Sequence, residues 1–307
     1  MTKQEENLMQ EKDADIAGKA FDAGRFKKTV WWIIMSGRRS HIRMTAGLAV
    51  GMAMLYLFAM TPYMGAHPDA AEWGVRPYVR YRNTMCEISS VVLLIVMIYG
   101  AGNIFGNMKT KQSRLTFLML PASGLEKYLA RLFDVTVMYF LCFVAAFVAA
   151  DIIQLVFSFA LTKGCHYSVT LFALKGGFIT HSHLYSLWSA GGISTVGALD
   201  GFAMYVMPLL WLHSSYVLGG TFFRRNHLLL TTCVHFAVGL VMSIVFIFMA
   251  SNIDFILFLE ENVYNLTGGL QVRVLTFLFF LFFVLDHLAA YKLSTRMQVI
   301  NKKWTNV

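Results

Sequence analysis

The sequence has few charged residues, few cysteines and few prolines for its length of 307 residues. Charged residues make up 14% of the chain, whereas soluble domains contain about 25%. Apolar residues make up 57%, and the mean hydropathy is +0.57. A globule of this size could not bury so much apolar surface, so part of that surface must face lipid. The composition therefore excludes a soluble enzyme, a nucleic-acid-binding domain and a disordered chain.

Motifs for catalysis and nucleotide binding are also missing from the sequence. It contains no GxxxxGK[ST] phosphate-binding loop, no HExxH, no GxSxG and no Ser-x-x-Lys. The four cysteines are too few for a disulfide scaffold, although Cys86 and Cys165 could pair on the outer side. His181 and His183 supply only two ligands, which do not make a zinc site. We expect no catalytic residue, no metal and no bound cofactor on this chain.

The apolar residues gather in six stretches long enough to cross a bilayer, which takes about 20 residues of helix. Lysine and arginine are retained on the cytoplasmic side of a membrane. With both termini inside, 20 of these residues are cytoplasmic and 6 are outside, and the opposite topology would invert this ratio. The sequence predicts an all-α integral membrane protein with both ends in the cytoplasm, so the net charge of +9 reports topology and not nucleic-acid binding. The predicted spans are Thr45–Met64, Glu87–Met108, Leu132–Leu161, Gly201–Phe223, Leu228–Ala250 and Val272–Tyr291.

The segment before the first span has two parts. Residues 1–24 are polar without periodicity, so we expect a poorly ordered tail followed by a single six-helix transmembrane domain over 25–307. From residue 25 the apolar residues recur at helical spacing and aromatic residues accompany them. We predict an interfacial helix lying flat on the membrane, while a soluble helix packed on a partner is the alternative. Its interfacial anchors are Phe26, Trp31 and Trp32.

The loop between the second and third spans predicts two short helices separated by Pro121. Proline pushes the preceding residue out of the helical region, which ends the first helix. Ser123 and Glu126 then have the spacing of a capping box, which starts the second helix. Several apolar residues in this loop are unusual for bare solvent. They favour a short cytoplasmic helix that contacts another protein, although a tight basic turn without a partner is the alternative.

Ionisable residues inside spans are functional hypotheses by default, because their burial in lipid is costly. Asp151 and Gln154 share one face of the third span, and His213 lies near the middle of the fourth. We take these three as candidate polar groups of a conduit. Two Gly-x-x-x-Gly pairs, Gly47/Gly51 and Gly102/Gly106, predict close helix packing within or between chains. The segment 251–271 predicts a re-entrant turn before the last span.

These features together resemble the ABC-2 class of ABC transporter permeases. The resemblance rests on six spans, the flat N-terminal helix, the loop helix after span two and the loop sequence from Arg114 to Arg131. It implies the membrane subunit of an exporter in the bacterial inner membrane, where two such chains form a conduit. It also implies separate ATPase subunits, which carry ATP and magnesium and dock on residues 109–120. The coupling residues implied there are Lys111, Arg114, Leu115, Phe117, Leu118 and Met119.

Two other functions remain open from the sequence. The chain could be a membrane anchor or sensor subunit whose basic loop binds a cytoplasmic regulator. It could also be a membrane enzyme that modifies lipids, although such an enzyme needs clustered polar groups on one membrane face. The sequence identifies neither the cargo nor the direction of transport.

Overall fold

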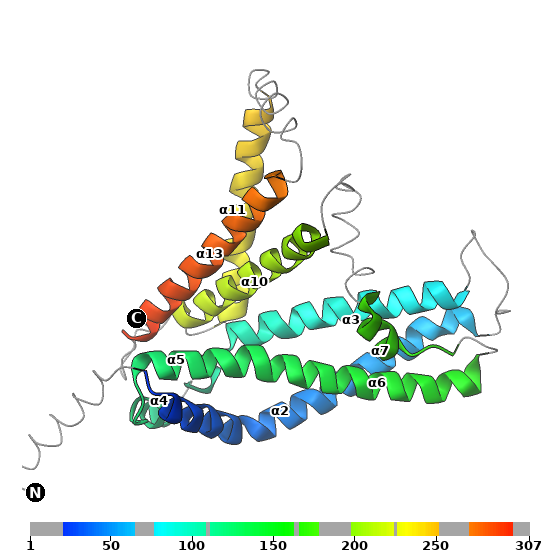
Figure 1. The fold of residues 1–307 in the computed structure, drawn as a ribbon, viewed down its shortest axis with the longest axis horizontal. Coiled ribbons are helices and arrows are strands. Elements are labelled where there is room, and N and C mark those ends of the chain that lie inside the picture. Colours follow the sequence, from blue (N-terminus) through cyan, green and yellow to red (C-terminus); the bar gives the residue numbers. More distant parts are fainter. Residues whose placement is uncertain are drawn as a thin grey trace, which may run out of the picture. The chain divides into compact units, whose positions relative to one another are not determined.

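The computed structural model describes residues 21–64, 77–108, 111–162, 166–177, 198–223, 226–251 and 270–296. Within these ranges the chain is helical and contains no β-strand (Figure 1). The long helices are α2 (Ala23–Met60), α3 (Pro77–Gly102), α6 (Tyr139–Leu161), α10 (Ala198–Phe222), α11 (His227–Ala250) and α13 (Leu270–Ser294). The shorter elements are η1 (Thr61–Tyr63), η2 (Gly106–Met108), α4 (Lys111–Leu118), α5 (Gly124–Phe133), the π-helical turns η3 (Asp134–Met138) and η4 (Ala173–Gly177), and α7 (Val169–Phe172).

Six helical stretches are long and apolar enough to cross a membrane, which confirms the predicted number and class. The side chains of α11 and α13 explain why lipid is needed, since most of their large apolar groups are exposed. Phe236 and Phe248 on α11, for example, are 74% and 78% exposed. Such surface is costly in water and costs nothing in hydrocarbon. The six stretches are Ala23–Tyr63, Val79–Gly102, Gly124–Leu161, Phe202–Phe222, His227–Met249 and Arg273–Ser294.

The N-terminal segment differs from the prediction. The sequence indicated a flat helix followed by a separate span, whereas α2 is one helix of 38 residues. At 1.5 Å per residue it is about 57 Å long, against a hydrocarbon core of about 30 Å. The apolar face chosen from the sequence is nevertheless the one that is used. Ile33 is fully buried, and Phe26 and Val30 pack against the same protein core, so this face contacts protein and not a lipid surface.

The predicted second span is displaced along the chain. The apolar run predicts a span over Glu87–Met108, but α3 covers Pro77–Gly102. The helix tolerates Arg82 because its guanidinium carbon lies 4.0 Å from the centre of the Phe172 ring, a cation–π arrangement. Gly102, the last residue of α3, packs closely against α11, since a Cβ on Gly102 would lie 2.5 Å from Leu228 Cδ2.

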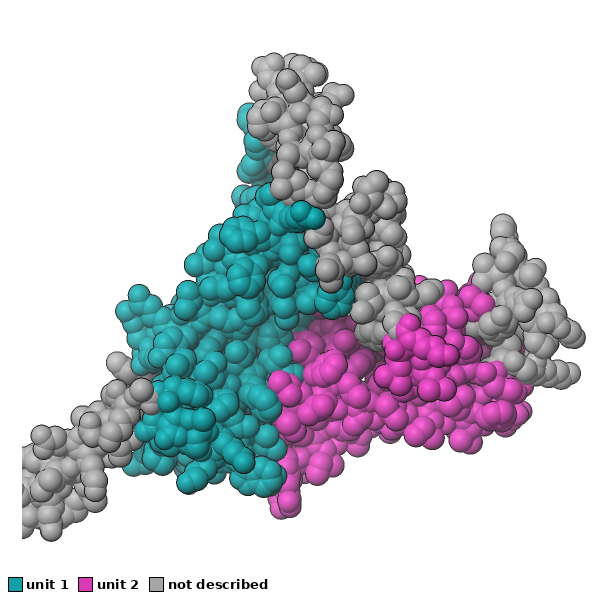
Figure 2. Space-filling view, in the orientation of Figure 1, with its two compact units in different colours: residues 1–35, 98–136, 195–307 teal, residues 36–97, 137–194 magenta. Residues whose placement is uncertain are grey.

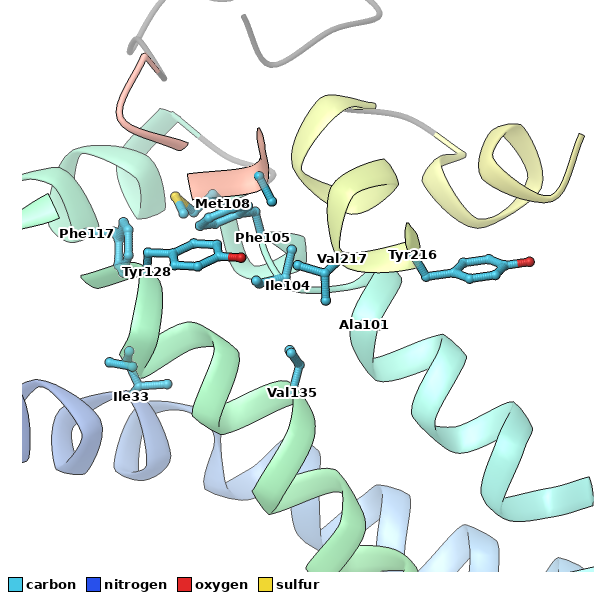
Figure 3. Close-up of a cluster of buried hydrophobic side chains, with 12 residues drawn as sticks. Ile33, Ala101, Ile104, Phe105, Met108, Phe117, Tyr128, Val135, Tyr216 and Val217 are labelled. Carbon is cyan, nitrogen blue, oxygen red and sulfur yellow. The ribbon is translucent and has the colours of Figure 1, made fainter. Parts of the chain in front are cut away.

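The contacts divide the chain into two compact units (Figure 2). Unit 1 comprises residues 1–35, 98–136 and 195–307, and unit 2 comprises residues 36–97 and 137–194. The divisions fall inside α2, α3 and η3, so each of these helical stretches contributes to both units. Each unit has its own apolar core. Unit 1 buries residues such as Ile104, Phe117 and Tyr128 (Figure 3), and unit 2 buries residues such as Met52, Tyr56 and Met85.

Candidate functional site

The helix α4 is fixed to unit 1 by two side chains that the sequence had placed on a docking surface. Arg114 is 7% exposed, and its Nε donates a hydrogen bond to the carbonyl oxygen of Met108 at 3.1 Å. Phe117 is 5% exposed and contacts Phe105 edge-on, with ring centres 6.4 Å apart. The guanidinium of Arg131 lies over Phe117 at 4.9 Å. Phe117 therefore belongs to the apolar core of unit 1 (Figure 3), and both Phe117 and Arg114 are too buried to form a docking surface.

The carboxyl end of α4 is held from the next helix. Lys127, on α5, donates from Nζ to the carbonyl oxygen of Leu118 at 2.7 Å. Carbonyl groups in the last turn of a helix have no partner within the helix, and the helix dipole favours a cation there. This bond therefore satisfies one orphan carbonyl and joins α4 to α5. The helix α4 is therefore anchored by Arg114 and Phe117 along its length and by Lys127 at its carboxyl end.

The predicted capping box at the start of α5 is present in full. Ser123 Oγ accepts from the backbone nitrogen of Glu126 at 3.3 Å, and Glu126 Oε2 accepts from the backbone nitrogen of Ser123 at 2.9 Å. Glu126 is fully buried, and its second oxygen does more than the sequence indicated. Oε1 accepts from the backbone nitrogen of Asp22 at 2.8 Å and from Arg25 Nη2 at 3.0 Å. One carboxylate thus joins the start of α5 to the start of α2.

Asp22 caps α2 at the same place. Its Oδ1 accepts from the backbone nitrogens of Arg25 at 3.1 Å and Gly24 at 2.6 Å. These two hydrogen bonds stabilise the charged form and hold the pKa of the Asp22 carboxyl below its ordinary value. Asp22, which lies three residues before the predicted start of the domain at residue 25, thus belongs to the start of α2.

The outward face of α4 is mixed in polarity, because the polar residues Gln112 and Thr116 are exposed beside apolar ones. Met119, just after α4, is 80% exposed and Leu115 is 37% exposed, while Leu118 is half-buried. On α5, Leu125 is 38% exposed. We call Leu115, Met119 and Leu125 the α4 surface. The side chain of Lys111 lies outside the described part of the chain, so the predicted coupling set separates into inward anchors and outward apolar residues.

The three predicted interfacial anchors also separate. Phe26 and Trp32 pack against the core cluster of unit 1, so neither is a free lipid anchor. Trp31 is 63% exposed and faces away from that cluster. Of the three, Trp31 alone presents an exposed aromatic ring of the kind found at the headgroup level.

Asp151 has a structural role that the sequence did not indicate. It is 2% exposed, and its carboxylate accepts three hydrogen bonds. Ser168 Oγ donates at 2.7 Å, and the backbone nitrogens of Val169 and Thr170 donate at 3.0 and 3.1 Å. Asp151 therefore caps the start of α7, a short helix that follows α6 in the chain. Gln154, one turn further along α6, is fully buried.

His213 belongs to a layer of polar groups inside unit 1. Its Nε2 lies 3.4 Å from Thr136 Oγ1. Next to it on α10, Ser214 donates to Asp286 Oδ2 at 3.0 Å, and on α13 His287 Nδ1 lies 3.0 Å from Tyr128 Oη. Thr136 sits in the π-helical turn η3, a type of element that often marks a functional position. The sequence could not bring these groups together, because they lie up to 159 residues apart.

Several predictions fall outside the described residues. They are the His181/His183 pair, the re-entrant turn over 252–269, Lys109 and the pairing of Cys165. Cys86, its proposed partner, is a buried free thiol. Within the described ranges, no three His, Cys, Asp or Glu side chains are grouped so that they could hold a metal ion.

The fold and its exposed apolar helices define a multi-pass α-helical membrane protein. No protein-family model, curated protein or solved structure matches the chain.

Proposed function

We propose that this chain is the membrane-spanning permease subunit of an ABC-type exporter. Two copies, or one copy and a related chain, form the conduit in the bacterial inner membrane. Separate ATPase subunits dock on the cytoplasmic loop between α3 and α5 and supply the ATP and magnesium. The chain itself binds no cofactor.

The observation that carries the proposal is the construction of the loop. A short helix presents Leu115 and Met119 outward, although these apolar side chains gain nothing from water. The inward side chains Arg114 and Phe117 hold the helix in place. An apolar surface on a well-anchored helix is what a stable protein–protein contact requires, because little ordering entropy is lost on binding.

The α4 surface is connected to a membrane-spanning helix. Lys127 joins the end of α4 to α5. The helical path then runs without interruption from α5 through η3 into α6, which is one apolar stretch from Gly124 to Leu161. A displacement of α4 by a partner would therefore act on a helical stretch that continues into a span, and packed elements of this kind carry the movements of switching proteins.

The composition of the spans indicates only the chemical class of the transported molecule. The spans are rich in methionine and aromatic residues, with 18 Met and 26 Phe in the chain. Such flexible and polarizable side chains suit an amphiphile, such as a lipid-linked molecule or a peptide. Of the candidate conduit groups, Asp151 is occupied by the cap of α7, which leaves Gln154 and His213 as candidates.

The test is purification of the complex from native membranes with substitutions on the α4 surface. Met119→Glu and Leu115→Glu place a charge where an apolar contact is expected. We expect each to reduce the co-purified ATPase by at least about tenfold, the effect of losing about 1.4 kcal/mol. Met119→Leu keeps the apolar contact and is the matched control, for which we expect normal recovery.

The readouts are the amount of a subunit with a phosphate-binding loop and its ATP hydrolysis. Undiminished recovery in both Glu variants contradicts docking at this surface. A companion without an ATPase motif that binds through Met119 instead supports the anchor or sensor function. Charge reversal at Arg114 is unsuitable for this test, because Arg114 is buried and its loss would disturb α4 itself.

A further inference from the structure

After α6 the chain turns back along the same helix. His166 stacks on Phe159 with ring centres 4.3 Å apart, and its Nδ1 lies 3.4 Å from Ser158 Oγ. Three residues later, the backbone nitrogen of Val169 donates to Asp151. From Asp151 to Ser158, seven residues of α6 rise about 10 Å. From His166 to Val169, three residues of extended chain cover the same distance, about 10 Å. The chain from His166 to Val169 is therefore extended and antiparallel to α6. We call residues 166–177 the returning segment.

The returning segment reaches a level well inside the end of α6. Asp151 is ten residues before Leu161, the last residue of α6, which corresponds to about 15 Å along the axis. Irregular backbone at such depth in a membrane is tolerated only where protein or water satisfies it. Asp151 satisfies the start of α7, and Ser168 Oγ accepts from the backbone nitrogen of Leu171 at 3.2 Å.

Two buried polar side chains beside Asp151 have no protein partner among the described residues. Gln154 is fully buried, and neither its Oε1 nor its Nε2 is hydrogen-bonded. Thr170 Oγ1 is also buried and unbonded. Gln154 lies one turn from Asp151 on the same side of α6, and the backbone nitrogen of Thr170 donates to that carboxylate. The two groups therefore flank the Asp151 carboxylate from different elements.

The chemistry of these groups selects the ligand. Gln154 offers two donors and an acceptor, and the hydroxyl of Thr170 can donate and accept. A cation would be repelled by the Gln154 amide hydrogens and by the first backbone amides of α7, and an anion would be repelled by the Asp151 carboxylate. A small neutral molecule that both donates and accepts hydrogen bonds is repelled by neither, and water is such a molecule. We propose that ordered water binds between Gln154 and Thr170, beside the Asp151 carboxylate.

A double-mutant cycle tests this site in the full-length chain in lipid nanodiscs. Gln154→Met and Thr170→Val remove the polar groups with little change of shape. Because each side chain then leaves the water with fewer partners, we expect each variant to unfold about 2–4 °C below the wild type. The double variant should lose less than the sum of the two, because both side chains bind the same water.

Two results overturn the proposal. A higher unfolding temperature for Gln154→Met means that the site is dry, since removing an unpaired buried amide then stabilises the fold. Strictly additive losses mean that the two side chains share no ligand. Ile153→Met, on the neighbouring face of α6 where the side chain is 36% exposed, is the matched control and should not change the unfolding temperature. Each variant is first checked for a monodisperse elution profile.

Discussion

Glu126 connects more of unit 1 than any other residue of the loop that the sequence singled out. Its carboxylate accepts from two backbone nitrogens and from Arg25, so it closes the start of α5 and fixes the start of α2. Arg25 is partly exposed, with 23% of its side chain accessible, so solvent weakens the ion pair. The bond from Ser123 is a larger part of the effect, because its backbone nitrogen would otherwise remain buried without this partner.

The first prediction compares the two halves of the capping box. Glu126→Ala leaves the nitrogens of Ser123 and Asp22 and the guanidinium of Arg25 without this acceptor, so we expect a loss of about 2–4 kcal/mol in unfolding free energy. Ser123→Ala removes one capping bond and should cost only about 1 kcal/mol. Denaturant unfolding of the purified chain measures both. Equal losses in the two variants would mean that the link to α2 contributes nothing.

The sequence predicts side-chain roles well where the partner is local. Ser123 and Glu126 are three residues apart, and the spacing alone identifies their hydrogen bonds. The sequence does not predict the role of Asp151, because its hydrogen-bond partners begin 17 residues later in the chain. It does not predict the burial of Arg114 either, because that depends on the turn at Met108. A charged residue in a loop sequence suggests exposure, and only the fold reveals that its guanidinium is turned inward.

At the scale of elements, the sequence predicts the helices but not which helices pack closely against one another. The Gly102/Gly106 pair was one of two candidate packing motifs, and the structure gives Gly102 a partner within unit 1. A Cβ on Gly220 of α10 would overlap the backbone oxygen of Gly102. On α2, by contrast, a Cβ added to Gly47 or Gly51 would meet no atom of the described residues within 4 Å. Identical spacing thus gives a close contact in one case only.

The second prediction tests this contact between α3 and α10. In Gly220→Ala the new methyl group meets backbone, which cannot rotate away, so the helices must separate. We expect a loss of about 1–3 kcal/mol, the usual cost of overpacking. Gly239→Ala on α11 is the matched control, because no atom of the described residues lies within 4 Å of its Cβ position. Its stability should rise slightly, since alanine favours helix over glycine, and equal behaviour of the two variants would contradict the close approach.

The continuous α2 illustrates why element boundaries escape the sequence. Arg38, Arg39 and Arg43 separate the amphipathic part from the apolar part, and this change of character suggested two helices. Nothing in the segment stops a helix, however, because no proline occurs between Ala23 and Met60. The composition of a helix indicates whether it lies in lipid, water or protein. The length of the helix depends instead on backbone geometry and on caps such as Asp22.

At the scale of the whole molecule, the sequence predicts the class because lipid imposes it. Six apolar stretches follow from composition, and the structure confirms them as helices. The polar layer around His213 and the returning segment after α6 could not be predicted, because they depend on contacts between distant residues. Function at this scale therefore rests on surfaces such as Leu115 and Met119, whose exposure appears only in the fold.

The last prediction concerns the side of the membrane on which these surfaces lie. Thr61, at the end of α2, and Met119, after α4, are both exposed, and α3 is the one described span between them. In a chain whose native cysteines are replaced by alanine, Thr61→Cys and Met119→Cys should therefore react from opposite sides. Because the predicted six-span topology puts 20 of the 26 basic residues on the Met119 side, we expect that side to be cytoplasmic. A membrane-impermeant maleimide applied to spheroplasts should label Thr61→Cys at once and Met119→Cys only after permeabilisation. Labelling of both in intact spheroplasts would contradict the passage of α3 through the membrane, and the reverse order would place the α4 surface out of reach of an ATPase.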